Sequence, residues 1–205
     1  CFSTITSMII MLSMVGPALL IPLYVQNALG LSALLSGLVI MPGAIINGIM
    51  SVFTGKFYDK YGPRPLIFTG FILLISCTFL LCFLKVDTSY TYLIVIYAIR
   101  MFAVSLLMMP INTTGINALK TEDISHGTAI MNFGRVMAGS LGTALMVTFM
   151  SIGAQWVVSS SEHASKEMIQ RQSVAVGVDV SFALVTVFVI IAFVLALFIK
   201  EPNHL

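Results

Sequence analysis

The stretch that decides the fold is Gly55-Lys56-Phe57-Tyr58-Asp59-Lys60-Tyr61-Gly62-Pro63-Arg64-Pro65-Leu66, which lies between two long apolar segments. It holds four charged side chains, at Lys56, Asp59, Lys60 and Arg64. Gly62 permits a tight turn, and the fixed φ of Pro63 suits the first turn of a helix that begins there. We therefore predict a short, stiff, charged loop that joins two apolar helices.

The composition around this loop is that of a membrane protein. Hydrophobic residues make up 59% of the chain and charged residues only 9%, whereas a soluble domain carries about 25% charged residues. Such a chain cannot cover itself with a solvated surface, so the lipid bilayer is its natural solvent. The net charge of +2 is small and scattered, which argues against a nucleic-acid partner.

Six segments are long enough to span the bilayer, since about 20 residues cross its hydrocarbon core as a helix. We therefore predict an all-α membrane protein with six transmembrane helices. The expected spans are residues 2–25, 34–54, 65–84, 92–111, 128–156 and 180–199.

The basic residues predict the orientation in the membrane. Six spans place both termini on one side, together with Lys56, Lys60, Arg64, Lys120 and Lys200, against Lys85, Lys166 and Arg171 opposite. Cytoplasmic loops carry the excess of basic residues. We therefore expect a cell membrane protein with both termini and the Gly55–Leu66 loop in the cytoplasm. Because Cys1 enters the first span with no initiating Met, we also expect the chain to be a fragment.

No enzyme motif, metal-ligand cluster or cofactor fingerprint is visible in the sequence. Cys1, Cys77 and Cys82 lie in apolar segments, and the three histidines are far apart along the chain. Zinc sites need ligands at close spacings, and no phosphate-binding or dinucleotide-binding glycine pattern is present. We predict no metal, no cofactor and no enzymatic activity.

The pattern of Gly55, Asp59, Gly62 and Arg64 resembles the signature loop of the major facilitator superfamily, which joins the second and third helices of each six-helix repeat. The resemblance implies that these four residues form a conformational latch, in which the Asp and the Arg hold one state by a charge and helix-dipole network. The alternative is an ordinary charged turn that anchors two helices.

Three further stretches resemble the C-terminal half of the fourteen-helix drug:proton antiporters, namely Ile21–Gly30, Gly37–Gly43 and Asn132–Ala144. The resemblance implies a 3+3 repeat bundle that forms one half of a major facilitator fold, with an N-terminal half missing. One departure stands out, because the predicted spans contain no acidic residue. Proton coupling would then depend mainly on the missing half.

Two arginines lie deep within the predicted spans, Arg100 and Arg135. Each costs about 2.5–3.5 kcal/mol at a helix centre, so neither should face lipid without compensation. We expect both to face the interior of the bundle. Each is either a structural charge bound to backbone carbonyls, or a fixed positive charge that tunes a protonatable site or orients a substrate.

Helix faces predict a substrate cavity and a packing surface. Flexible, polarisable methionines suit varied apolar ligands, and they occur with polar residues on the first and fourth spans, at Met11, Met14, Met101, Ser105, Met108 and Asn112. The alternative is that these residues belong to the core. Gly134, Ala138 and Gly142 form a small-residue stripe that lets another helix approach closely. Asn47, Ser51 and Gly55 form a more polar stripe, which we expect to contact the fifth helix or the missing half.

Residues 153–179 are expected to form a water-exposed outer connection. Its sequence from Ser159 to Glu162 resembles a helix start, and the following residues predict a short amphipathic helix.

Together these features predict a multidrug exporter that exchanges lipophilic compounds, cationic ones included, for protons by alternating access. Its expected partners are the lipid bilayer, lipophilic small molecules, protons and the missing N-terminal half. A transporter of the same superfamily with a narrower substrate is one alternative, and it would carry more polar side chains on the first and fourth helices. A self-contained six-helix channel or membrane scaffold is the other.

Overall fold

The computed structural model describes residues 2–117, 119, 121–160 and 166–198. These residues form helices, and no β-strand occurs among them. The helices are α1 (Phe2–Asn27), α2 (Ala33–Tyr61), α3 (Pro63–Leu80), η1 (Leu81–Phe83), α4 (Tyr90–Asn117), η2 (Thr121–Asp123), α5 (Ile124–Ser160) and α6 (Lys166–Leu197). Helices α1 to α6 are each long and apolar enough to cross a membrane. The prediction of an all-α protein with six membrane-length helices is confirmed.

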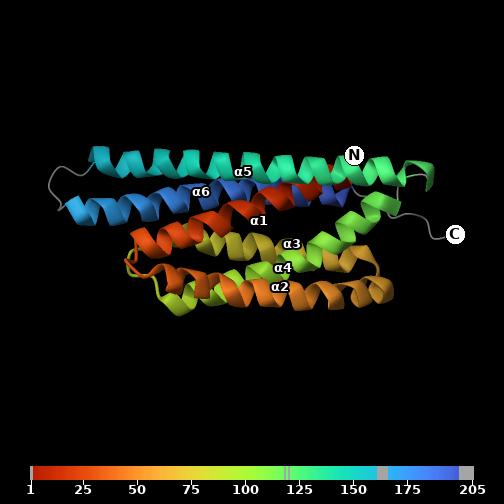
Figure 1. Ribbon diagram of the computed structural model, residues 1–205, viewed down its shortest axis with the longest axis horizontal. Coiled ribbons are helices and arrows are strands. Elements are labelled where there is room, and N and C mark those ends of the chain that lie inside the picture. Colours follow the sequence, from red (N-terminus) through yellow and green to blue (C-terminus); the bar gives the residue numbers. More distant parts are fainter. Residues whose placement is uncertain (1, 118, 120, 161–165, 199–205) are drawn as a thin grey trace.

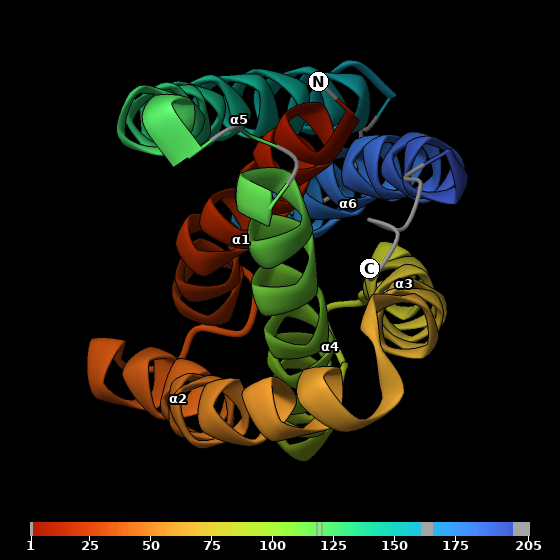
Figure 2. The ribbon, with the colours of Figure 1, turned by 90° about the vertical axis from the view of Figure 1, so that its right-hand side faces the viewer.

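The six long helices run side by side along one axis (Figure 1). Seen from the end, α5 and α2 lie on opposite sides, α1 and α4 lie between them, and α3 and α6 lie together on a third side (Figure 2). Helix α1 packs mainly on α5 and α6, while α4 packs mainly on α2 and α3. The first of the first three long helices therefore packs with the last three, and the first of the last three packs with the first three.

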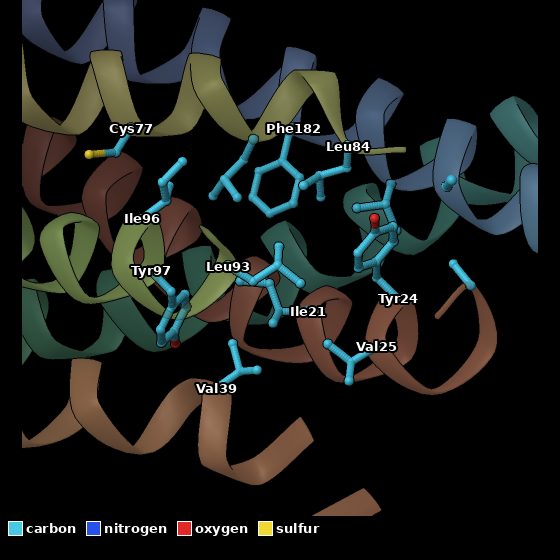
Figure 3. Close-up of a cluster of buried hydrophobic side chains, with 14 of the residues drawn as sticks. Ile21, Tyr24, Val25, Val39, Cys77, Leu84, Leu93, Ile96, Tyr97 and Phe182 are labelled. Carbon is cyan, nitrogen blue, oxygen red and sulfur yellow. The ribbon is translucent and has the colours of Figure 1, made fainter. Parts of the chain in front are cut away.

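Burial identifies α1 and α4 as the central helices. In the most apolar part of each helix, 67% of residues are buried in α4 and 50% in α1, against 17% in α2 and 22% in α5. One cluster of buried side chains joins α1 and α4 to the other helices, as Figure 3 shows for Tyr24, Tyr97 and Phe182. The hydroxyl of Tyr24 also donates to the carbonyl of Lys85, 2.5 Å away, and so ties α1 to the turn before α4.

The predicted loop between Gly55 and Leu66 is almost entirely helical. Helix α2 continues through Tyr61, α3 begins at Pro63, and Gly62 alone separates the two helices. Gly62 has φ 78° and ψ 178°, and its N–H donates to the carbonyl of Tyr58. The charged side chains are compatible with a helix once it leaves the bilayer, because Lys is a good helix former.

In the predicted outer connection over residues 153–179, the described residues extend the two neighbouring helices and do not form a separate short helix. Helix α5 continues to Ser160, and α6 begins at Lys166, fourteen residues before the predicted span. Ser161 and Glu162, part of the predicted helix start, lie outside the described residues. The two helices stay together because Gly153 and Gly177 face each other, and a Cβ at Gly153 would lie 2.9 Å from the Cα of Gly177.

Candidate functional site

A cavity of about 320 Å³ lies between α2 and α4. Helix α2 contributes two of its lining residues, and α4 contributes the other six. They are Asn47, Ser51, Ser105, Met108, Met109, Asn112, Thr113 and Ile116. None of these eight side chains is acidic or basic, so the cavity offers amide and hydroxyl groups beside methionine thioethers. We call it the α2–α4 cavity.

Helix α1 is joined to this cavity through one hydrogen bond. The hydroxyl of Ser7 donates to Oδ1 of Asn112 over 3.2 Å. The amide of Asn112 therefore lies where α1, α2 and α4 meet. Because this hydrogen bond fixes the orientation of the amide, its NH₂ donors and the second lone pair of its oxygen also have fixed directions.

Two polar residues of α2, one in the wall of the cavity and one beside it, hold α2 against α4. The side-chain amide of Asn47 donates to the backbone carbonyl of Met101 over 3.1 Å. The hydroxyls of Thr54 and Ser105 lie 3.4 Å apart, within hydrogen-bonding distance. The polar stripe of Asn47, Ser51 and Gly55 thus lies beside α4 and not beside the fifth helix, and its contact with a missing half stays a prediction.

The structure brings together only part of the predicted substrate cavity. Ser105, Met108 and Asn112 line the α2–α4 cavity. Met101 is buried against α2, next to Gly43. On α1, Met11 lies beside Gly139 of α5, and Met14 packs into the buried core. Asn47 and Ser51 are lining residues that the sequence marked only as a polar stripe.

The predicted latch residues lie around the joint between α2 and α3. Gly55 faces Met109 of α4, whose Cε would lie 3.2 Å from a Cβ at this position. Asp59 is exposed on the last turns of α2, and Arg64 is exposed at the second residue of α3. Gly62 is the joint itself. The carboxyl end of one helix dipole therefore meets the amino end of the next within one residue.

The two deep arginines have different surroundings. Arg100 is fully buried, and its Nη2 donates to the backbone carbonyl of Ser13 on α1. Its Nε and Nη1 have no partner among the described residues. Arg135 on α5 is half-buried, and its Nε is likewise buried without a partner in the described part of the chain.

The small-residue stripe of α5 faces α1. A Cβ at Gly134 would overlap the side chain of Met8, and one at Gly142 would lie 3.0 Å from the Cα of Leu12. Ala138 lies between them and is half-buried. Because these positions lack bulk, the backbones of α1 and α5 lie close together.

An acidic residue also lies directly before the predicted sixth span, within the longer helix that the structure forms there. Asp179 belongs to α6 and is half-buried. Its Oδ1 accepts a hydrogen bond from the N–H of Leu84 over 3.0 Å, which places it at the turn between α3 and α4. The predicted sixth span begins at Val180 and so leaves Asp179 out, whereas α6 begins at Lys166 and includes it.

The comparisons with known proteins agree with this architecture. The family model described as "Major Facilitator Superfamily" matches residues 2–143. The lincomycin resistance protein LmrB of Listeria monocytogenes is 37% identical over 185 residues, which cover 90% of this chain and 39% of LmrB. LmrB of Bacillus subtilis is 35% identical, with coverage of 94% and 40%.

A more distant relative carries a broader name. The multidrug export protein EmrB of Escherichia coli is 29% identical over 134 residues, which cover 65% of this chain and 26% of EmrB. The chain thus spans about two fifths of the length of its first curated relatives. Its six membrane-length helices and the family match over most of its residues show that it belongs to the major facilitator superfamily of membrane transporters.

Proposed function

We propose that this chain forms the C-terminal half of a multidrug exporter, which moves lipophilic compounds out of the cell by alternating access in exchange for protons. The observation that carries the proposal is the α2–α4 cavity, which combines methionines with uncharged polar groups in a chain similar to drug-resistance and drug-export proteins. Flexible thioethers accommodate apolar ligands of different shapes, and amides orient them.

The exposure of α2 and α5 supports a missing half. In the most apolar stretch of each helix, only 17% of the residues of α2 and 22% of those of α5 are buried, although both helices have the length of full spans. On the side opposite α3 and α6, the surface of α1, α2 and α5 lies open (Figure 2). We infer that an N-terminal half covers this side and that the rest of α2 and α5 faces lipid.

The lining of the α2–α4 cavity supports recognition of the substrate by uncharged groups in this half of the transporter. No acidic side chain lines it, so a cationic substrate would need its counter-charge from the missing half. Protons would be carried mainly by that half as well. We infer that the amides of Asn47 and Asn112 recognise hydrogen-bonding groups of the substrate and that Met108 and Met109 contact its apolar part.

We further infer that Gly55, Asp59, Gly62 and Arg64 act as the latch. Because Gly62 alone separates α2 and α3, a change in the interactions of Asp59 or Arg64 would move both helices together. We place the joint and both termini in the cytoplasm, because the excess of basic residues lies on that side of the predicted spans. Arg135, with its buried Nε, would bind an acceptor in the missing half.

The test is efflux by the full-length protein in a bacterial strain whose own drug exporters are deleted. We expect raised resistance to lincomycin and at least one unrelated lipophilic drug, and energy-dependent efflux of a lipophilic dye that stops when a protonophore collapses the gradient. Asp59→Asn and Arg64→Ala should lower efflux at unchanged membrane abundance.

Three outcomes would contradict parts of the proposal. No resistance at normal membrane abundance would reject drug export. Resistance to a single compound would favour the narrower-substrate alternative. Efflux that continues at full rate without a gradient would reject proton exchange.

A further inference from the structure

Helix α1 contains a gap in its backbone hydrogen bonding at its centre. In an α-helix each N–H donates to the carbonyl four residues earlier, and Pro17 has no N–H. The carbonyl of Ser13 is therefore left without its usual donor. Ser13 and Pro17 are both buried, and no water is available in the membrane interior to take the place of the missing donor.

The fully buried side chain of Arg100 fills this gap from α4. Its Nη2 donates to the Ser13 carbonyl, although the two residues are 87 positions apart. Three other prolines also lie inside helices, and Pro22, Pro42 and Pro110 release the carbonyls of Ala18, Leu38 and Leu106. Of the four carbonyls released by prolines in the described helices, that of Ser13 accepts a hydrogen bond from a charged side chain of another helix.

We propose that Arg100 and Pro17 act as a unit, in which Pro17 bends α1 and the guanidinium of α4 replaces the N–H that Pro17 lacks and so holds this bend in place against α4. Each partner accounts for the other. The carbonyl needs a donor from outside its helix, and the guanidinium needs an acceptor in a place where its Nε and Nη1 have none among the described residues.

This pairing makes Arg100 a positioning residue for the α2–α4 cavity. The arm of α1 before the bend carries Ser7, which binds Asn112 at the cavity. If the bend relaxes, Ser7 moves relative to Asn112 and the cavity changes shape. This consequence rests on the proposed function, whereas the pairing itself does not.

The pairing is tested by a double-mutant cycle on the thermal stability of the full-length protein in detergent. Pro17→Ala supplies the missing N–H and would stabilise an ordinary helix. Here it should lower the unfolding temperature, because the new N–H competes with Arg100 for the Ser13 carbonyl and the straightened helix draws that carbonyl away from the buried guanidinium. In the Arg100→Met background the same substitution should raise the unfolding temperature, because it restores a donor to Ser13.

Pro22→Ala is the matched control, since it lies on the same helix and releases the exposed Ala18. Its effect should be the same in the wild-type protein and in the Arg100→Met background. If Pro17→Ala changes the unfolding temperature by the same amount in the wild-type protein and in the Arg100→Met background, the proposal is overturned. Stabilisation by Pro17→Ala with Arg100 present would also overturn it, a result that needs no measurement on the Arg100→Met protein.

The positioning role needs a second measurement. The Arg100→Met, Pro17→Ala double variant should regain stability but require a severalfold higher dye concentration for half-maximal efflux, because its α1 is straight. Wild-type half-saturation in this variant would overturn the positioning role. Absence of dye efflux from the wild-type protein would reject the proposed function instead, and the stability cycle would still stand or fall by itself.

Discussion

At the scale of single residues, Asn112 shows how much of the site depends on one amide. It accepts a hydrogen bond from Ser7 and lines a cavity that Asn47 and Ser51 complete from the other side. Its position near the C-terminal end of α4 could be predicted from the sequence. Its partner could not, because the two residues are 105 positions apart.

Asn112→Leu should weaken substrate binding while leaving the fold intact, since the two side chains have the same number of heavy atoms and the same branching. A lost hydrogen bond costs about 1 kcal/mol, or roughly a fivefold rise in half-saturating dye concentration. Steady-state efflux at several dye concentrations measures it. Val95→Ala, at an exposed position of the same helix, is the control and should leave half-saturation unchanged. Equal half-saturation in wild type and Asn112→Leu would remove the amide from the site.

Gly62→Ala should destabilise the protein by about 1–3 kcal/mol, because φ 78° with ψ 178° is a conformation that glycine alone adopts readily. No atom lies within 4 Å of a Cβ built at Gly62, so a loss would come from the backbone alone. Thermal unfolding in detergent measures it. Gly37→Ala is the control, because it is helical and equally open, and it should be neutral or stabilising. If both variants unfold at the wild-type temperature, the joint does not need glycine.

At the scale of helices, the structure differs from the sequence prediction at the ends, where helices run past the apolar core. Helix α2 continues through the charged residues to Tyr61, and α6 begins at Lys166. Hydropathy reports where lipid ends, and backbone hydrogen bonding decides where a helix ends. Glycine and proline at the α2–α3 joint mark a true end, and the prediction there was wrong only in its length.

The close crossing of α5 and α6 gives a prediction at this scale. A Cβ at Gly177 would overlap the backbone carbonyl oxygen of Met150, and a backbone atom cannot move aside as a flexible side chain can. Gly177→Ala should therefore cost about 1–3 kcal/mol, measured by thermal unfolding. Gly48→Ala, which meets nothing within 4 Å, should cost nothing. Equal stability of the two variants would mean that α5 and α6 separate easily.

At the scale of the whole molecule, α1 and α4 lie at the centre while α2 and α5 remain largely uncovered. Lipid can cover their apolar residues, but it offers no partner for buried polar atoms such as Nε of Arg135, which lacks one in the described part of the chain. This exposure supports the proposal that an N-terminal half covers part of these helices.

We therefore predict that the 205-residue chain by itself inserts into membranes but does not transport. Vesicles that contain it alone should show no gradient-dependent dye uptake, and co-expression with the remainder of the full-length protein should restore uptake. Saturable uptake by the 205-residue chain alone would reject the half-transporter proposal and favour a self-contained six-helix unit.

The sequence by itself determined the class of the protein and the number of its long helices. With 59% hydrophobic and 9% charged residues, the chain can be solvated only by lipid, and in lipid its backbone must form helices. The residues around Gly62 were enough to indicate the superfamily, which the family match confirms.

Only the tertiary structure decided which faces meet, because lipid is as apolar as a protein core and hydrophobic periodicity no longer marks the buried side. The first three long helices and the last three do not pack as separate groups, and α1 and α4 each join the other set. The pairing of Arg100 with the carbonyl of Ser13, and that of Ser7 with Asn112, follow from this exchange. Such contacts depend on how whole helices cross, which no local pattern in the chain encodes.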